Sequence, residues 1–178
     1  VHVYKADAGS NAIESAFRLI QQPRELEKKW NAKKVHDTHF CDHHHPVNFN
    51  VGKIAGGDWA SSVPSWCTFD MRVGVLPSQN LKECRQEIED LLRQAAANDP
   101  FLGNNPPSVT WEGFQAEPFV LKNHEKVREV LAQAHQTVFG SALEYKTSTG
   151  TADNRFFGLY AGIPALVSMS AASAQDVC

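Results

Sequence analysis

The order of the periodic segments is the feature that most constrains how this chain can fold. Residues 10–30 and 80–98 repeat apolar side chains every three or four positions, which predicts two amphipathic helices. Residues 47–56, 66–76 and 108–121 alternate apolar with polar side chains, which predicts three strands. One further strand at or before the first residue would complete the order βαββαβ, the split βαβ or ferredoxin-like pattern. We therefore expect an α+β fold, with a mainly antiparallel sheet and helices on one of its faces.

Local signals give the expected ends of the two helices. Ser10 or Asn11 can cap the first helix, and Ser78 or Asn80 can cap the second, because their side-chain oxygens accept from free backbone N–H groups. Pro23 lies inside the first helical pattern, lacks an N–H and clashes with the preceding turn. It therefore predicts a break or a kink at that position.

The pattern changes after about residue 121. Residues 124–139 predict a helix, 156–161 a second short helix, and 163–169 a buried strand. This tail has too little apolar surface to form a comfortable core alone. We therefore expect two parts, a βαββαβ domain over 1–121 and an incomplete α/β piece over 122–178.

Composition excludes some classes of function. With 17 Lys+Arg against 20 Asp+Glu, the formal charge is −3, which argues against a nucleic-acid binder. No apolar run approaches the roughly 18 to 20 residues that span a bilayer, so we expect no membrane segment. Four widely spaced cysteines favour a reducing compartment, the cytoplasm. Val1 is not a start methionine, so the chain is expected to be cut at its N-terminus.

Residues 36–45 gather the side chains that a metal ion would use. This segment holds His36, His39, Cys41, Asp42, His43, His44 and His45. Imidazole, thiolate and carboxylate are zinc ligands, but the spacing matches no zinc finger, and three adjacent histidines cannot all face one ion. A solvated polar loop is the favoured interpretation, with a metal site as the alternative.

A second polar segment precedes the short helix at 156–161. The Gly150-Thr151 turn offers backbone N–H groups and a hydroxyl, which suit a carboxylate or an oxyanion. A structural interpretation is equally open, in which Asp153 caps the helix and Arg155 pairs with Asp153. No nucleophile-elbow, phosphate-loop or dinucleotide-binding glycine motif is present in the sequence.

Three stretches, in order along the chain, resemble one known family. They are His2-Val3 with Gly9 to Glu14; Asn48 to Gly52 with Gly56-Gly57, Val63-Pro64 and Phe69 to Arg72; and Gly150 to Asp153 with Arg155 and Gly162 to Pro164. Together they resemble the zinc-dependent aminoacylases and carboxypeptidases. That family includes acetylornithine deacetylase, succinyl-diaminopimelate desuccinylase, N-carbamoyl-amino-acid hydrolases and glutamate carboxypeptidase.

The resemblance implies a domain plan and a cofactor. Family members insert a βαββαβ lid or dimerization domain into a catalytic domain that holds two zinc ions. Residues 1–121 would then be the lid, and 122–178 the start of the second catalytic segment. The family's early metal ligands would precede Val1, and Cys178 stands near the place of the final histidine. We therefore expect no metal ligand in this chain and no hydrolysis by the chain alone.

The resemblance also assigns residues to the substrate. His2 matches the lid histidine that reaches the partner's active site in the dimer and stabilises the oxyanion. Arg72 matches the arginine that holds the substrate carboxylate, and Gly150 and Thr151 match a turn at the substrate. Ser61 stands where the family has an asparagine, which puts carboxamide contacts there in doubt. Without the resemblance, His2 is an exposed histidine at a strand end.

The implied function is that of a homodimeric, substrate-capping part of a zinc amidohydrolase. Its substrates would be small molecules, namely N-acyl or N-carbamoyl amino acids or small peptides. Two alternatives stay open. The chain could be a free-standing ferredoxin-like module that senses a small carboxylate through Arg72, or a metal-binding protein that uses residues 36–45. Arg72 could also be a plain surface arginine, paired with Asp70 or Glu117.

Overall fold

A computed structural model describes residues 1–167 of the chain. Its internal contacts separate two compact units, Val1–Pro118 and a second unit that begins at Phe119. Each unit is described by itself below. The assignment of 1–121 to a lid and of 122–178 to a catalytic domain stays a prediction.

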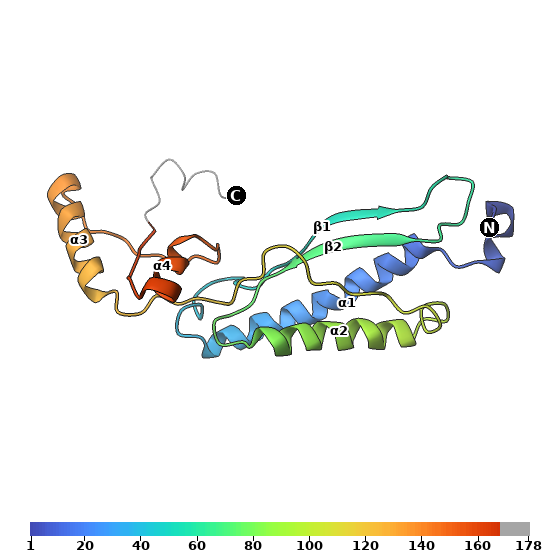
Figure 1. The fold of residues 1–178 in the computed structure, drawn as a ribbon, viewed down its shortest axis with the longest axis horizontal. Helices are drawn as coiled ribbons and strands as arrows, with labels where there is room; N and C mark the ends of the chain where they lie inside the picture. Colours follow the sequence, from blue (N-terminus) through green and yellow to red (C-terminus); the bar gives the residue numbers. More distant parts are fainter. Residues whose placement is uncertain (168–178) are drawn as a thin grey trace. The chain divides into compact units, whose positions relative to one another are not determined.

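The first unit places two helices under a two-stranded antiparallel sheet (Figure 1). Its elements are the 3-10 helix η1 (Val3–Ala8), α1 (Ala12–Ala32), the 3-10 helix η2 (Lys33–His36), β1 (Phe49–Gly56), β2 (Cys67–Val73) and α2 (Leu81–Ala97). Helix α1 packs against both strands and against α2. The predicted α+β class, with an antiparallel sheet and helices on one face, is confirmed.

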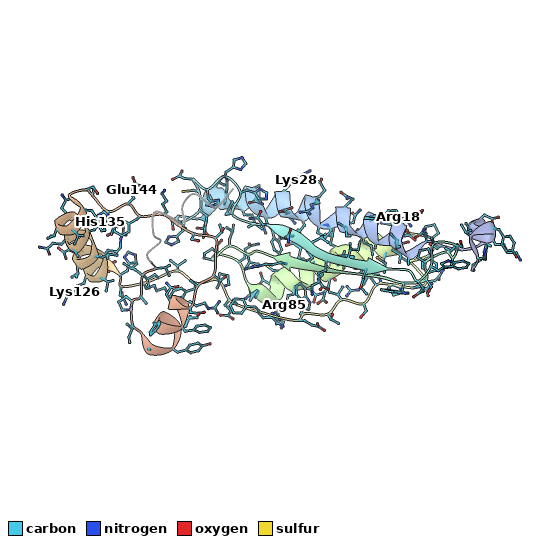
Figure 2. All side chains as sticks on the ribbon, turned by 90° about the horizontal axis from the view of Figure 1, so that it is seen from above. Arg18, Lys28, Arg85, Lys126, His135 and Glu144 are labelled. Carbon is cyan, nitrogen blue, oxygen red and sulfur yellow. The ribbon has the colours of Figure 1, made fainter. Side chains whose placement is uncertain are left out.

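Both predicted asparagine caps are present. The Asn11 side chain accepts from the N–H groups of Ile13 and Glu14. At the start of α2, the Asn80 side chain accepts from the N–H groups of Lys82 and Glu83. Charged side chains lie on the outer helix faces, among them the exposed Arg18 and Lys28 on α1 and the half-buried Arg85 on α2 (Figure 2).

The strands pair from Phe49 opposite Val73 to Gly56 opposite Cys67, with one irregularity between Val51 and Lys53. Side chains of β2 alternate between the half-buried face and the exposed face. The half-buried face turns toward a core around Trp30, whose ring meets Phe49 edge-on at 5.1 Å between centroids. The buried apolar residues of this core are Leu19, Leu26, Trp30, Val47, Phe49, Leu76, Cys84, Ile88, Leu92, Ala96 and Leu102.

Of the predicted break or kink at Pro23, the break does not occur, because α1 runs through this residue as one helix, and the kink stays a prediction. Pro23 is fully buried. The apolar packing of its ring therefore offsets the intrahelical hydrogen bond that its missing N–H cannot make.

The strand predicted over 108–121 does not form, and the strand predicted at or before Val1 lies mostly outside the residues that the structure describes. The expected first strand has only one counterpart, an isolated bridge between His2 and Ser62. Residues 108–121 form no strand, although the alternation there is genuine. Its part within the first unit, residues 108–118, contacts α2 instead, where the indole N–H of Trp111 donates to Glu89 at 2.7 Å. A strand needs a neighbour for its backbone, and residues 1–167 place none beside this segment.

The second unit contains α3 (Glu125–Phe139) and α4 (Asn154–Ala161). Both predicted helices are confirmed, and each ends at a glycine with positive φ, Gly140 at 68° and Gly162 at 64°. The predicted strand at 163–169 is wrong over 163–167, which are irregular, and its last two residues lie outside the described part. Within residues 119–167 no strand is available to pair with it.

Candidate functional site

His2 is held at a turn beside the β1–β2 connection. The N–H of Val3 donates to the Ser61 carbonyl at 2.9 Å, and the N–H of Val63 donates to the Val1 carbonyl at 2.8 Å. These bonds fix the backbone on both sides of His2. Its side chain is exposed and accepts from the Tyr4 N–H at 3.4 Å through Nδ1. The structure thus brings together two predicted site residues, His2 and Ser61.

Arg72 lies on the open face of the sheet, opposite Asn50 of β1. This face carries no helix, and Arg72 is exposed. The side chain of Asp70, one of the two partners considered for Arg72, lies 3.7 Å from Lys53 instead. Within residues 1–167 no ion pair of Arg72 is formed. The guanidinium is therefore available to a carboxylate ligand, for which its fork is suited.

Gly150 and Thr151 belong to the second unit and are both exposed. The Gly150 N–H donates to the Ser148 hydroxyl at 3.0 Å. Asp153 occupies the position before α4, but its carboxylate accepts no capping hydrogen bond. The capping interpretation of Asp153 is therefore wrong, and the role of the Gly150-Thr151 turn stays a prediction.

Residues 36–45 begin at the last residue of η2 and continue as an irregular loop with turns, and their histidines do not converge on one point. In the described part of the chain, no three His, Cys, Asp or Glu side chains come close enough to hold one metal ion. His45 instead contacts Glu27 of α1, at 3.2 Å between Nε2 and Oε1. The ammonium group of Lys34 donates to the carbonyls of His43 and His44. The loop is thus tied down by protein contacts.

Sequence reasoning missed a polar clamp between α1 and the start of β1. The Asn31 side chain donates to the Val47 carbonyl at 2.7 Å and accepts from the Val47 N–H at 3.0 Å. Two residues further on, the Phe49 N–H donates to Glu27 at 2.8 Å, and Arg24 donates to the Phe49 carbonyl. The available signal was the spacing of Glu27 and Asn31, which puts two polar residues beside the apolar stripe of α1.

Electrostatics suit this clamp. Burial of Glu27 opposes its ionisation, but hydrogen bonds from the Phe49 N–H, His45 and Arg24 outweigh burial and lower the pKa of the carboxyl group. Arg24 also pairs with Glu27 at 3.0 Å. The folded protein therefore favours the ionised form of the Glu27 carboxyl group.

The clamp covers only part of the outer edge of β1, the edge that faces away from β2. Backbone groups of alternate residues point toward the partner strand in an antiparallel pair. The Gly57 N–H donates to the Trp66 carbonyl at 3.1 Å, so Gly56 and Ile54 direct their N–H and C=O groups outward. No side chain of residues 1–167 hydrogen-bonds to the β1 backbone beyond Phe49. A bare edge therefore runs from Val51 to Gly56.

The first unit thus combines a two-stranded sheet with unpaired outer edges, an open polar sheet face and a histidine whose backbone is fixed beside the β1–β2 connection. Comparison with known families agrees with this description. The peptidase dimerisation domain model matches residues 1–100, which is more than half of the 178 residues, and the chain belongs to that family.

One curated relative extends the comparison beyond the dimerisation domain. The chain is 25% identical over 175 residues to N-formyl-4-amino-5-aminomethyl-2-methylpyrimidine deformylase of Halalkalibacterium halodurans. The match covers 94% of this chain and 40% of that protein, so the chain spans well under half the length of the relative. Both comparisons point to a hydrolase family. None of the helices described for this chain has the length and apolar character to cross a membrane.

Proposed function

We propose that this chain is the dimerization and substrate-capping part of a zinc amidohydrolase that acts on C–N amide bonds. Membership of the peptidase dimerisation domain family supports the dimerization role, and similarity to a deformylase supports a role in an enzyme that acts on amide bonds. The proposed substrates are N-acyl or N-carbamoyl amino acids or small peptides. The chain alone is proposed to be inactive.

The observation that carries the proposal is the bare edge of β1 from Val51 to Gly56. An unpaired edge is a template for another strand. A second copy could pair with it antiparallel around a two-fold axis, which would join two sheets into one. The clamp on Val47 and Phe49 would end that pairing at a defined position, since those backbone groups are already bonded to α1.

The proposed chemistry of this chain is binding and orientation. Arg72 would hold the substrate carboxylate with its two-pronged guanidinium. His2 of one protomer would donate from its imidazole to the oxyanion that forms in its partner's active site. The N–H groups of the Gly150-Thr151 turn, with Ser61 near His2, would complete the substrate contacts. Closure of the domain over the substrate would exclude water.

Residues 1–167 do not fit a zinc site, because no three ligating side chains converge there. Zinc in the parent enzyme therefore stays a prediction from the family resemblance, and no step is assigned to a metal here. We also propose a cytoplasmic location. The three cysteines within the described residues, Cys41, Cys67 and Cys84, are free thiols, which suits a reducing compartment.

Removal of a single backbone N–H tests whether the chain forms the proposed dimer. Ile54→Pro removes an N–H that faces outward from β1 and leaves the hydrogen bonds between β1 and β2 in place. Ile54→Val keeps the N–H and is the matched control. In sedimentation velocity at tens of micromolar, we expect dimers for the unmodified chain and for Ile54→Val, and monomers for Ile54→Pro. A monomeric unmodified chain would contradict the proposal.

Calorimetry with N-acyl amino acids separates this proposal from the free-standing sensor. The proposed function predicts little affinity, because the isolated chain lacks the catalytic half of the site. Tight binding that is lost in Arg72→Gln would favour the sensor instead.

A further inference from the structure

We propose that the turn after His2 selects one tautomer of its imidazole, and that Tyr4 and Trp59 are positioning residues for that ring. The selected form carries its proton on Nε2 and so can only donate from that atom. This inference rests on the proposed function, in which His2 is a hydrogen-bond donor to an oxyanion.

The first step is the position of the backbone. His2 is bridged to Ser62, and hydrogen bonds on either side of it join Val1 to Val63 and Val3 to Ser61. Its φ and ψ of −70° and 145° are ordinary extended values, so no strain opposes this position. The Cα of His2 is therefore held against the β1–β2 connection before its side chain makes any contact.

The second step is the tautomer. His2 occupies the position before η1, and its Nδ1 accepts from the Tyr4 N–H at 3.4 Å. In a neutral imidazole one nitrogen accepts and the other carries the proton. A bond accepted at Nδ1 therefore places the proton on Nε2. Among residues 1–167, no hydrogen bond is formed by Nε2, so its N–H is available to a ligand.

The choice of residue supports this step. Serine, threonine, aspartate and asparagine satisfy the first N–H groups of a helix better than histidine does. Capping alone therefore does not favour histidine at position 2. What only histidine adds is a second ring nitrogen on the far side of the ring, whose protonation the capping bond controls.

The third step is the orientation of the ring. The Tyr4 ring lies 5.3 Å from the imidazole at 46°, and the Trp59 ring lies 5.9 Å away, edge-on at 74°. Both side chains are largely exposed, at 73% for Tyr4 and 63% for Trp59. Large aromatic side chains gain little from burial at such exposure. Their common feature is that each one contacts the imidazole, which limits its rotation.

Long-range ¹H–¹⁵N correlation spectra of the ¹⁵N-labelled 178-residue chain test the tautomer. The His2 signals are those that disappear in His2→Gln, and the spectra are recorded where the imidazole is neutral. We expect an unprotonated Nδ1 and a protonated Nε2, with loss of the Nδ1-protonated form that a peptide of residues 1–6 shows. A protonated Nδ1, or the same mixture as in the peptide, would overturn the inference.

Two pairs of variants test the positioning residues. Trp59→Ala should move the ring-proton shifts of His2 toward the peptide values, and Trp59→Phe should restore most of the shift. Tyr4→Ala should likewise move the His2 shifts toward the peptide values, and Tyr4→Phe should restore most of the shift. Both variants retain the backbone N–H that donates to Nδ1. Unchanged His2 shifts in both alanine variants would refute the positioning role.

An activity measurement separates this inference from the proposed function. His2→Gln in the full-length protein tests whether this residue contributes to kcat. Full activity of that variant would remove the catalytic role of His2, whereas the tautomer is read directly from the spectra. A peptide-like tautomer mixture beside a large loss of kcat would keep the proposed function and remove only the inference.

Discussion

Replacement of Asn31 by alanine is the sharpest test of the clamp between α1 and β1. Val47 is fully buried, and both its N–H and its C=O are bonded to the Asn31 side chain. Alanine at position 31 leaves both groups without that partner. A buried backbone group left unsatisfied costs about 1–3 kcal/mol. Two such groups predict a loss of about 2–6 kcal/mol, a large share of the roughly 5–15 kcal/mol that stabilises a domain.

Urea unfolding of the 178-residue chain measures this loss, with tryptophan fluorescence reporting on the first unit, which contains all four tryptophans including the buried Trp30. Gln21→Ala is the control, because Gln21 is an exposed residue on the same helix and should change stability by less than about 0.5 kcal/mol. If Asn31→Ala unfolds within about 0.5 kcal/mol of the unmodified chain, the clamp contributes nothing to stability, and the reasoning fails.

Three further perturbations follow from the same contacts. The pKa of Glu27 is lowered by folding, so its stabilising contribution is present above the ordinary value of 4.5 and is lost as the pH falls through the folded pKa. Glu27→Gln should therefore flatten the stability profile below pH 4.5, and an unchanged acid slope would contradict this. Trp111→Phe removes the bond to Glu89 and should raise hydrogen exchange in residues 108–118 with α2 unaffected; equal exchange in both proteins would argue against docking. Asn80→Ala should lower thermal stability by about 1 kcal/mol, and no shift in Tm would show that the cap is unimportant.

The sequence was sufficient for the four α-helices and the hairpin, because each depends on a local signal, but not for the two 3-10 helices. The capping oxygens of Asn11 and Asn80 are four or fewer residues from the groups they bind. The alternation over β2 reports directly on one buried face and one open face. Such signals can be read from neighbouring residues alone.

Features that depend on distant partners could not be predicted in this way. Residues 108–121 alternate as a strand does, yet pairing needs a neighbour that residues 1–167 do not place there. Pro23 has a breaking signal, but its burial against the core decides the outcome. At the candidate site, His2 was predicted, whereas its contact with Trp59 joins positions 57 residues apart and has no pattern in the sequence.

The clamp and the bare edge are best understood as one device. An exposed strand edge invites non-specific pairing, and proteins usually cover such edges or place prolines on them. Here α1 covers the edge at Val47 and Phe49 with three polar side chains, and the cover stops there. The ladder becomes irregular immediately afterwards, between Val51 and Lys53, and the remaining edge contains no proline. In the proposed dimer, this partial cover would favour a partner that pairs from Val51 to Gly56 in a single register, because pairing shifted toward Phe49 would have to break its hydrogen bonds to Glu27 and Arg24.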